Sequence, residues 1–96
     1  VPMLLSRPPC PEEKQHQVRV ALAPGVPAQL HEVFTERTGI YLLDAYGATE
    51  SNATIGTTIE TRRPGWMGKL FDGFQARVAD EDDNEVPDGT PGELLL

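Results

Sequence analysis

Residues 27–43 of the chain read PAQLHEVFTERTGIYLL. Apolar side chains recur in the first part at the i, i+3, i+4 spacing that places them on one face of a helix: Leu30, Val33 and Phe34. A proline in the first turn and a glycine just past the last turn are typical of helix ends, so the pattern predicts a helix over roughly 27–38 that stops at Gly39. The apolar run 40–43 is typical of a buried strand in a parallel sheet.

A second strand lies upstream of this helix. Residues 17–22 read QVRVAL and alternate well enough for a strand, which the Ala-Pro-Gly sequence after Leu22 ends. Two strands joined by a helix predict one βαβ unit, because parallel strands need a crossover connection that is usually helical. Downstream, residues 74–79 alternate, polar turn residues follow, and residues 92–96 begin another strand. The predicted fold class is α/β, a βαβ piece of a parallel sheet followed by antiparallel β structure.

These patterns divide the chain into three segments. Residues 1–16 are expected to be a lead-in or linker edge, in which four prolines among the first eleven positions exclude a regular helix over residues 1–11. Residues 17–51 hold the βαβ piece and the polar loop that follows it, and residues 52–96 form a β-rich segment. The sequence begins without Met and stops inside an apolar strand with no partner after it, so we expect an interior piece of a longer protein.

Composition excludes several classes of function. The 96 residues include 15 acidic against 8 basic side chains, and the acidic excess lies in residues 80–93, which hold no Lys or Arg. This argues against a nucleic acid partner, and the acidic segment is predicted to be a solvated turn. A single Cys10 rules out a disulfide framework. The lone cysteine makes a reducing, cytoplasmic setting the expectation. Apolar runs are too short for a membrane span.

The segment Asp44–Ser51 (DAYGATES) is the candidate site. It directly follows the strand predicted over 40–43, at the edge of an open α/β sheet where ligands bind. A glycine lets the backbone approach a phosphate, a threonine hydroxyl can donate to a phosphate oxygen, and a neighbouring glutamate can hold Mg²⁺. From spacing alone, an ordinary polar loop after a strand is the favoured interpretation.

Four stretches resemble motifs of the adenylate-forming superfamily in family order. YGATES at 46–51 resembles Y-G-x-T-E, FTERTGI at 34–40 is similar to F-x-E-R-F-G-I, RPGWMGK at 63–69 is similar to R-P-G-S-V-G-K, and VPDGTPGEL at 86–94 resembles V-P-x-G-E-x-G-E-L. The resemblance covers roughly residues 17–96 and is greatest to acyl-CoA synthetases, in particular the bacterial crotonobetaine/carnitine-CoA ligase type. It implies that the chain is an excerpt of the large N-terminal domain of such an enzyme.

The resemblance also implies roles for individual residues. Tyr46 would lie against the adenine, Thr49 would contact the ATP phosphates, and Glu50 would help to hold Mg²⁺, so that Thr49 and Glu50 are the implied catalytic residues. The remaining residues of the nucleotide loop would act mainly through their backbone: Asp44, Ala45, Gly47 and Ala48. The turn after the first strand, where the family carries G-G-A-P, reads LAPG at 22–25 and leaves Pro24 and Gly25 as the matching ATP-binding positions.

The implied activity is ATP-dependent ligation of a carboxylic acid to CoA through an acyl-adenylate. The cofactors and substrates would be ATP, Mg²⁺, CoA and a small carboxylate. The family's phosphate loop would lie upstream of residue 1, and its ribose-binding aspartate and lysine-bearing C-terminal domain would lie beyond residue 96. The 96 residues are therefore expected to be inactive without the rest of the parent chain.

Two other interpretations stay open. An aryl- or amino-acid-adenylating enzyme of the same superfamily would carry the same nucleotide motif. A free-standing small interaction domain without catalysis would instead use the loop 46–50 only as a connection. Such a domain would pair its strand at 94–96, whereas a fragment would expose that strand or use it for self-association.

Other notable side chains receive structural predictions. His16 and His31 are expected at solvated positions rather than at a shared metal site. Trp66, Phe71 and Phe74 are expected to pack within the β-rich segment.

Overall fold

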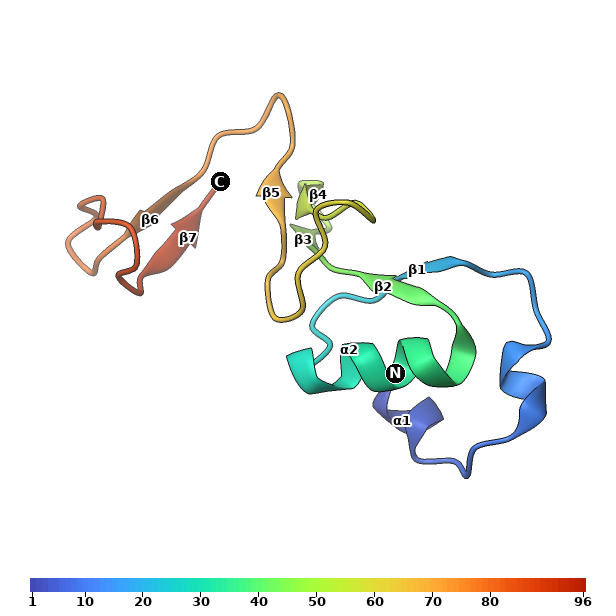
Figure 1. The fold of residues 1–96 in the computed structure, drawn as a ribbon. Helices are drawn as coiled ribbons and strands as arrows, with labels where there is room; N and C mark the ends of the chain where they lie inside the picture. The colour runs from blue at the N-terminus through green and yellow to red at the C-terminus, as the bar shows by residue number, and fades with distance from the viewer.

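The computed structural model describes residues 1–96, and Figure 1 shows an elongated arrangement of short elements, with extents of 53 × 24 × 24 Å. In chain order the elements are α1 (Pro2–Leu5), the 3-10 turn η1 (Pro11–Lys14), β1 (Val20–Leu22), α2 (Ala28–Thr38), β2 (Tyr41–Leu43), β3 (Ala45–Ala48), β4 (Asn52–Gly56), β5 (Lys69–Leu70), β6 (Arg77–Ala79) and β7 (Glu93–Leu95). They form a parallel pair β1–β2, an antiparallel sheet β3–β4–β5 and an antiparallel pair β6–β7. The predicted α/β class is confirmed.

The βαβ unit forms as the sequence predicts. Strands β1 and β2 pair in parallel, with Val20 opposite Tyr41 and Leu22 opposite Leu43, and α2 connects them. Gly39 ends the helix in the left-handed conformation (φ 76°), and its amide donates to the carbonyl oxygen of Thr35 at 2.8 Å. A residue with a Cβ adopts this conformation only with strain, so the glycine fixes the end of the helix.

A small core lies between α2 and the strand pair. Its buried members are Val26, Phe34 and Leu42. The predicted helical face is only partly correct, because Leu30 and Phe34 pack inward while Val33 is 43% exposed. The buried stripe instead passes through His31, which is 3% exposed, so the expectation of a solvated His31 is wrong. The core against α2 includes Val1 and Leu5 of the lead-in as well as residues of the strand pair, so the buried face of the helix is wider than the predicted apolar stripe.

The lead-in is held against α2. The prediction of a non-helical lead-in is wrong for Pro2–Leu5, where α1 tolerates its proline in the first turn. Arg37 of α2 donates to the carbonyl oxygens of Leu5 (2.9 Å) and Arg7 (3.0 Å) and forms a two-point ion pair with the carboxylate of Glu13. This ion pair holds the pKa of Glu13 below its ordinary value. One guanidinium therefore fixes most of the lead-in to the helix.

Antiparallel pairing begins at Ala45, directly after β2. Strands β3 and β4 form a hairpin in which Tyr46 is opposite Ile55 and Gly47 is opposite Ala53, so Thr54 is an extra, unpaired residue. This is a β-bulge, and the hydroxyl of the fully buried Thr54 donates to the carbonyl oxygen of Tyr46 at 3.4 Å. The division at residue 52 stays a prediction, although the hairpin crosses it.

The strand at the C-terminal end has a partner. β7 pairs with the upstream strand β6, with Leu94 opposite Val78 and Ala79 opposite Glu93, so the expectation that a fragment would expose this strand is wrong. Figure 1 shows this pair at one end of the long axis, away from the βαβ unit. The acidic residues between these strands form the solvated turn that the sequence predicts, in which Asp80 accepts the amides of Asp82 and Asn84.

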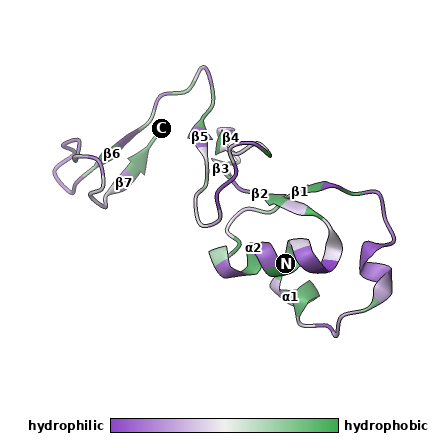
Figure 2. Ribbon diagram, viewed as in Figure 1, coloured by the Kyte–Doolittle hydropathy of each residue, from purple (hydrophilic) through white to green (hydrophobic).

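Much of the apolar surface is uncovered. The accessible surface is 7332 Å², whereas a compact monomer of 10.5 kDa exposes roughly 5,400 Å². The expected packing within the β-rich segment is confirmed for Phe71, whose ring lies against Gly56 of β4 although it is 42% exposed. It is wrong for Trp66 and Phe74, which are 56% and 40% exposed. Figure 2 shows apolar and polar segments alternating along the elongated chain. Because the strand pairs are short, many of the apolar side chains stay exposed. No helix combines the length and apolar character needed to cross a membrane.

Candidate functional site

An open groove lies beyond the carboxyl ends of β1 and β2. It has a volume of about 610 Å³ and is lined by Leu22, Pro24, Gly25, Ala45, Tyr46, Gly47, Ala48, Thr49, Asn52 and Ala53. The structure thus brings together two segments that the family resemblance places at the nucleotide, 22–25 and 44–51. Of the predicted site residues, only Asp44 and Glu50 are outside the lining.

The two walls of the groove come from different sheets. One wall is the turn that follows β1, in which Gly25 adopts a left-handed conformation (φ 72°). The other wall is β3 with the turn that connects it to β4. The carboxylate of Asp44 lies between them, because its Oδ1 accepts the amide of Gly25 at 3.2 Å and the amide of Ala45 at 2.8 Å.

The β3–β4 hairpin needs a glycine at one position. A Cβ on Gly47 would lie 2.0 Å from the carbonyl oxygen of Asn52, so any larger residue would push the strands apart. The turn itself is closed by side chain and backbone together, since the amide of Ala48 donates to the hydroxyl of Ser51 at 3.3 Å. Asn52 takes a positive φ of 56°, which asparagine tolerates better than most residues. The glycine of the motif therefore has a structural reason in this chain.

The three residues whose side chains are predicted to bind the ligand, Tyr46, Thr49 and Glu50, are all exposed. Tyr46 is 41% exposed and lines the groove, which leaves part of its ring free to meet a planar group. Thr49 lines the groove in the exposed hairpin turn, and Glu50 follows it in the same turn. The structure brings Tyr46 and Thr49 to one groove and places Glu50 at its margin.

A single exposed carboxylate fits Mg²⁺ better than it fits a metal held entirely by protein. No group of three or more His, Cys, Asp or Glu side chains capable of holding a metal ion occurs in the structure. Mg²⁺ is commonly bound by one or two carboxylates together with phosphate oxygens and water. Glu50 fits that arrangement as one protein ligand beside a phosphate-bearing substrate.

The groove lining itself carries no charge. Its residues are apolar, small or hydroxyl- and amide-bearing, without a Lys, Arg, Asp or Glu among them. A neutral wall of small residues accepts a flat ring closely but leaves a bound phosphate uncompensated. Glu60, further along the chain, has its pKa lowered by its own backbone amide and by the hydroxyl of Thr58, and it does not line the groove.

Three lining residues were missed by the sequence analysis: Leu22, Asn52 and Ala53. Leu22 could have been found, since it is the last residue of the strand that leads into the Pro24–Gly25 turn. Asn52 and Ala53 face the groove because β4 returns beside β3, with Asn52 opposite Ala48. That register depends on the hairpin and is not marked by any motif.

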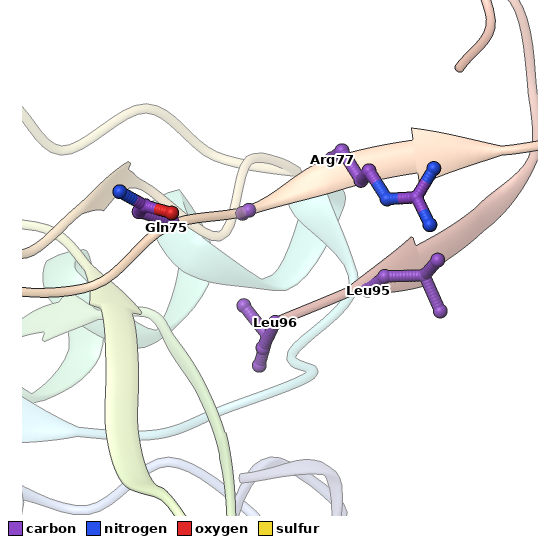
Figure 3. Close-up of a pocket in the computed structure, with 5 residues that line it drawn as sticks. Gln75, Arg77, Leu95 and Leu96 are labelled. Atoms are coloured by element: carbon purple, nitrogen blue, oxygen red, sulfur yellow. The ribbon is translucent and has the colours of Figure 1, made fainter. Parts of the chain in front are cut away.

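A smaller hollow lies at the open end of the β6–β7 pair. It has a volume of about 350 Å³, and Figure 3 shows Gln75 and Arg77 on one strand segment opposite Leu95 and Leu96 on the other. None of the predicted site residues is part of it. Apolar leucines with one arginine offer no nucleophile, acid–base pair or metal ligand set, so this hollow is not the candidate site.

Comparison with known proteins gives the same family throughout. The family model described as "AMP-binding enzyme" matches residues 3–96. The crotonobetaine/carnitine–CoA ligase of Salmonella paratyphi B is 31% identical over 97% of this chain, which spans 19% of that protein.

Two solved structures agree. The benzoate CoA ligase of Burkholderia xenovorans superposes on 95% of the chain (TM-score 0.81, 26% identity, 19% of that protein). An anthranilate CoA ligase in complex with anthranoyl-AMP superposes on 84% (TM-score 0.76, 29% identity, 17% of that protein). The chain thus spans about a fifth of the length of its relatives, and it belongs to the family of AMP-binding enzymes.

Proposed function

We propose that this chain is the adenine- and phosphate-facing part of an ATP-dependent acyl-CoA ligase, the full-length protein of which activates a carboxylic acid as an acyl-adenylate and transfers it to CoA. The observation that carries the proposal is the groove in which Tyr46, Gly47 and Thr49 meet the Pro24–Gly25 turn. The match to AMP-binding enzymes over residues 3–96 supports it.

The first step is adenylation. A carboxylate oxygen of the acid attacks the α-phosphorus of ATP, the bond from that phosphorus to the oxygen bridging it to the β-phosphate breaks, and pyrophosphate leaves. Mg²⁺, when bound, neutralises the charge that grows on the phosphate oxygens. Glu50 would hold it at the margin of the groove.

The chain's own residues would orient the nucleotide for this step. The ring of Tyr46 lies against one face of the adenine, and the backbone of Pro24 and Gly25 limits the other side of the groove. The hydroxyl of Thr49 donates a hydrogen bond to a phosphate oxygen where negative charge develops. The uncharged lining suits the base, so the phosphates must point toward the Mg²⁺ that Glu50 would hold and toward basic groups outside these residues.

The second step transfers the acyl group. The sulfur of CoA attacks the acyl carbon of the adenylate, the mixed anhydride bond breaks, AMP leaves and the thiol proton is released. None of the groove residues is a general base for this step. We therefore assign to this chain the binding of ATP and the support of adenylation.

Two classes of acid are supported by different observations. The sequence relative is a crotonobetaine/carnitine–CoA ligase, whereas the two superposed structures are benzoate and anthranilate CoA ligases. The groove described above contacts the nucleotide, and its residues do not separate these classes. An aryl-activating ligase is the second candidate.

The test is acid-dependent exchange between ATP and labelled pyrophosphate, measured on the full-length protein with crotonobetaine, carnitine, benzoate and anthranilate. Exchange that depends on one acid, followed by formation of its CoA thioester, supports the proposal and names the acid class. A purified, folded protein that binds ATP weakly and shows no exchange with any member of a broad acid panel would overturn it.

A further inference from the structure

We propose that Thr57 is a positioning residue of the groove, because its hydroxyl fixes the backbone of Asp44 and thereby the relation between the two groove walls. Its expected effect on ATP rests on the function proposed above, whereas its hold on the walls does not. Thr57 directly follows β4 and does not line the groove, so it acts through Asp44.

Asp44 is the one residue at which the chain passes from one sheet to another. Residues 41–43 form β2 of the parallel pair, and residues 45–48 form β3 of the antiparallel sheet. The backbone angles of Asp44 therefore set the direction in which β3 leaves the strand pair. One groove wall follows β1 and the other includes β3, so a rotation at Asp44 changes the separation of the walls.

Thr57 faces Asp44 at the end of the β3–β4 pairing. The register places Ala45 opposite Gly56, and Thr57 is opposite Asp44 one residue further. The Thr57 amide donates to the Asp44 carbonyl oxygen at 3.1 Å, as in a regular antiparallel pair. In a regular pair the Asp44 amide would donate back to the backbone carbonyl oxygen of Thr57. It donates instead to the Thr57 hydroxyl, at 3.0 Å.

The hydroxyl thus replaces a backbone acceptor. It accepts the Asp44 amide and also donates to the Asp44 carbonyl oxygen at 3.2 Å, so one side chain bonds to both backbone groups of that residue. The carbonyl group of Thr57 is left out of the pairing. The chain can therefore leave the sheet at once and enter the turn that Thr58 and Thr61 close with their hydroxyls.

The fixed backbone also directs the carboxylate of Asp44. Its Oδ1 atom accepts the amide of Ala45 at 2.8 Å and the amide of Gly25 at 3.2 Å, so this side chain touches both walls. Asp44 is among the residues predicted to bind ATP, and a change in its position is expected to reach the nucleotide. The Thr57 hydroxyl is therefore placed to control ATP binding without contacting ATP.

The hold on the walls is tested by amide hydrogen exchange in the full-length protein without ligand, resolved to single residues by mass spectrometry with electron-transfer fragmentation. Thr57→Val keeps the shape of the side chain and removes the hydroxyl, so the Asp44 amide should exchange about fivefold faster, as expected for one lost hydrogen bond. The Gly25 amide, which donates to the Asp44 carboxylate, should accelerate by a similar factor. Thr57→Ser keeps the hydroxyl, and both of its amides should exchange as in the wild type.

Thr58→Val is the matched control, because it removes the neighbouring hydroxyl, which bonds to Thr61 within its own turn. It should leave the exchange of both amides unchanged. The amide of Gly39, at the end of α2, reports any general loss of structure. If Thr57→Val accelerates Gly39 as well, Thr57→Ala takes its place, since a smaller side chain cannot overpack the site.

Two results would overturn the hold on the walls. The first is an unchanged Gly25 amide beside a faster Asp44 amide in Thr57→Val, because the hydroxyl would then fix only the residue that it touches. The second is Gly25 exchange in Thr57→Ser as fast as in Thr57→Val, because the hydroxyl would then not be the group that matters.

The effect on the nucleotide is measured by pyrophosphate exchange in the same variants. Thr57→Val should raise the KM for ATP about fivefold with a smaller change in kcat, and Thr57→Ser should keep the wild-type KM. A wild-type KM in Thr57→Val, together with an accelerated Gly25 amide, would overturn the role toward the nucleotide. Wild-type protein that exchanges no pyrophosphate would instead contradict the proposed function, while Gly25 exchange would still decide the hold on the walls.

Discussion

The carbonyl oxygen of Asn52 lies so close to the α-carbon of Gly47 that a methyl group on that carbon would be 2.0 Å from it. Both atoms belong to the backbone of the β3–β4 hairpin, so neither can move without moving the strand. The groove wall that carries Tyr46 and Thr49 thus depends on a hydrogen atom in place of a side chain.

Replacement of Gly47 by alanine should therefore separate β3 from β4. We expect a loss of stability of about 1–3 kcal/mol, the range for overpacking, and at least a tenfold loss of pyrophosphate exchange in the full-length protein. Urea unfolding and exchange kinetics measure the two effects. Gly89→Ala is the control, since a Cβ there meets nothing within 4 Å and only the positive φ of 83° is strained. Equal exchange rates in both variants would contradict this account.

Tyr46 tests the stacking role. Base–aromatic stacking is worth about 1–3 kcal/mol, so Tyr46→Ala should raise the KM for ATP by about tenfold or more. Tyr46→Phe keeps the ring and should stay close to the wild-type KM. The measurement is ATP titration of pyrophosphate exchange. If the phenylalanine variant is as impaired as the alanine variant, the hydroxyl rather than the ring is what the nucleotide requires.

Glu50 tests the metal assignment. Glu50→Ala should abolish adenylation at ordinary Mg²⁺ concentrations and recover partly when Mg²⁺ is raised, because the ligand lost is one of several oxygens around the ion. Glu81→Ala, in the exposed acidic turn, is the control and should behave like wild type. Wild-type exchange rates in Glu50→Ala would refute the assignment.

Arg37 and Glu13 predict a pH dependence of stability. Hydrogen bonding to Arg37 holds the pKa of Glu13 below its ordinary value. A group whose pKa is lower in the folded state adds stability at neutral pH, and that contribution is lost as the pH falls below about 4.3 and through the folded-state pKa. Glu13→Gln should flatten this part of the pH profile of the urea midpoint. Glu12→Gln is the neighbouring control and should leave the profile as it is.

The same pair predicts a protease-sensitive lead-in. Arg37→Ala removes every bond from α2 to the carbonyl oxygens of Leu5 and Arg7. We expect faster trypsin cleavage after Lys14, at the end of η1, than in the wild-type chain. Arg19→Ala removes a cation elsewhere and serves as the comparison. Equal cleavage rates in the two variants would mean that the lead-in is held mainly by the packing of Val1 and Leu5.

Sequence patterns predicted the βαβ unit because its signals are local. The helix has its stop at Gly39, and each strand is a short apolar or alternating run bounded by turn residues. Patterns could not predict that His31 would be buried and Val33 exposed, since this depends on which face of α2 is covered by the strand pair and by the lead-in. They also placed Trp66 in a core that these 96 residues do not build.

The candidate site was likewise predictable from the sequence only in part. The segment at 46–50 was visible as a polar, glycine-bearing stretch after a strand, whereas the turn at 24–25 entered the site only through its resemblance to the family's motif. The approach of Asn52 to the groove depends on hairpin register, and the bond from Gly25 to Asp44 joins residues that are 19 positions apart. Neither contact leaves a periodic signal in the chain.

The bulge at Thr54 also bears on how this segment can change in length during evolution. The bulge exposes Asn52 and Ala53 of β4 to the groove, whereas the next three residues, 54–56, are all buried. A regular strand, whose side chains alternate between its two faces, would not bury three consecutive residues on one face. Deleting one residue here would turn the groove-facing pair inward and bring buried residues out. We therefore expect homologous chains to accept substitutions mainly at the exposed residues 52 and 53, and almost no insertion or deletion between residues 52 and 56.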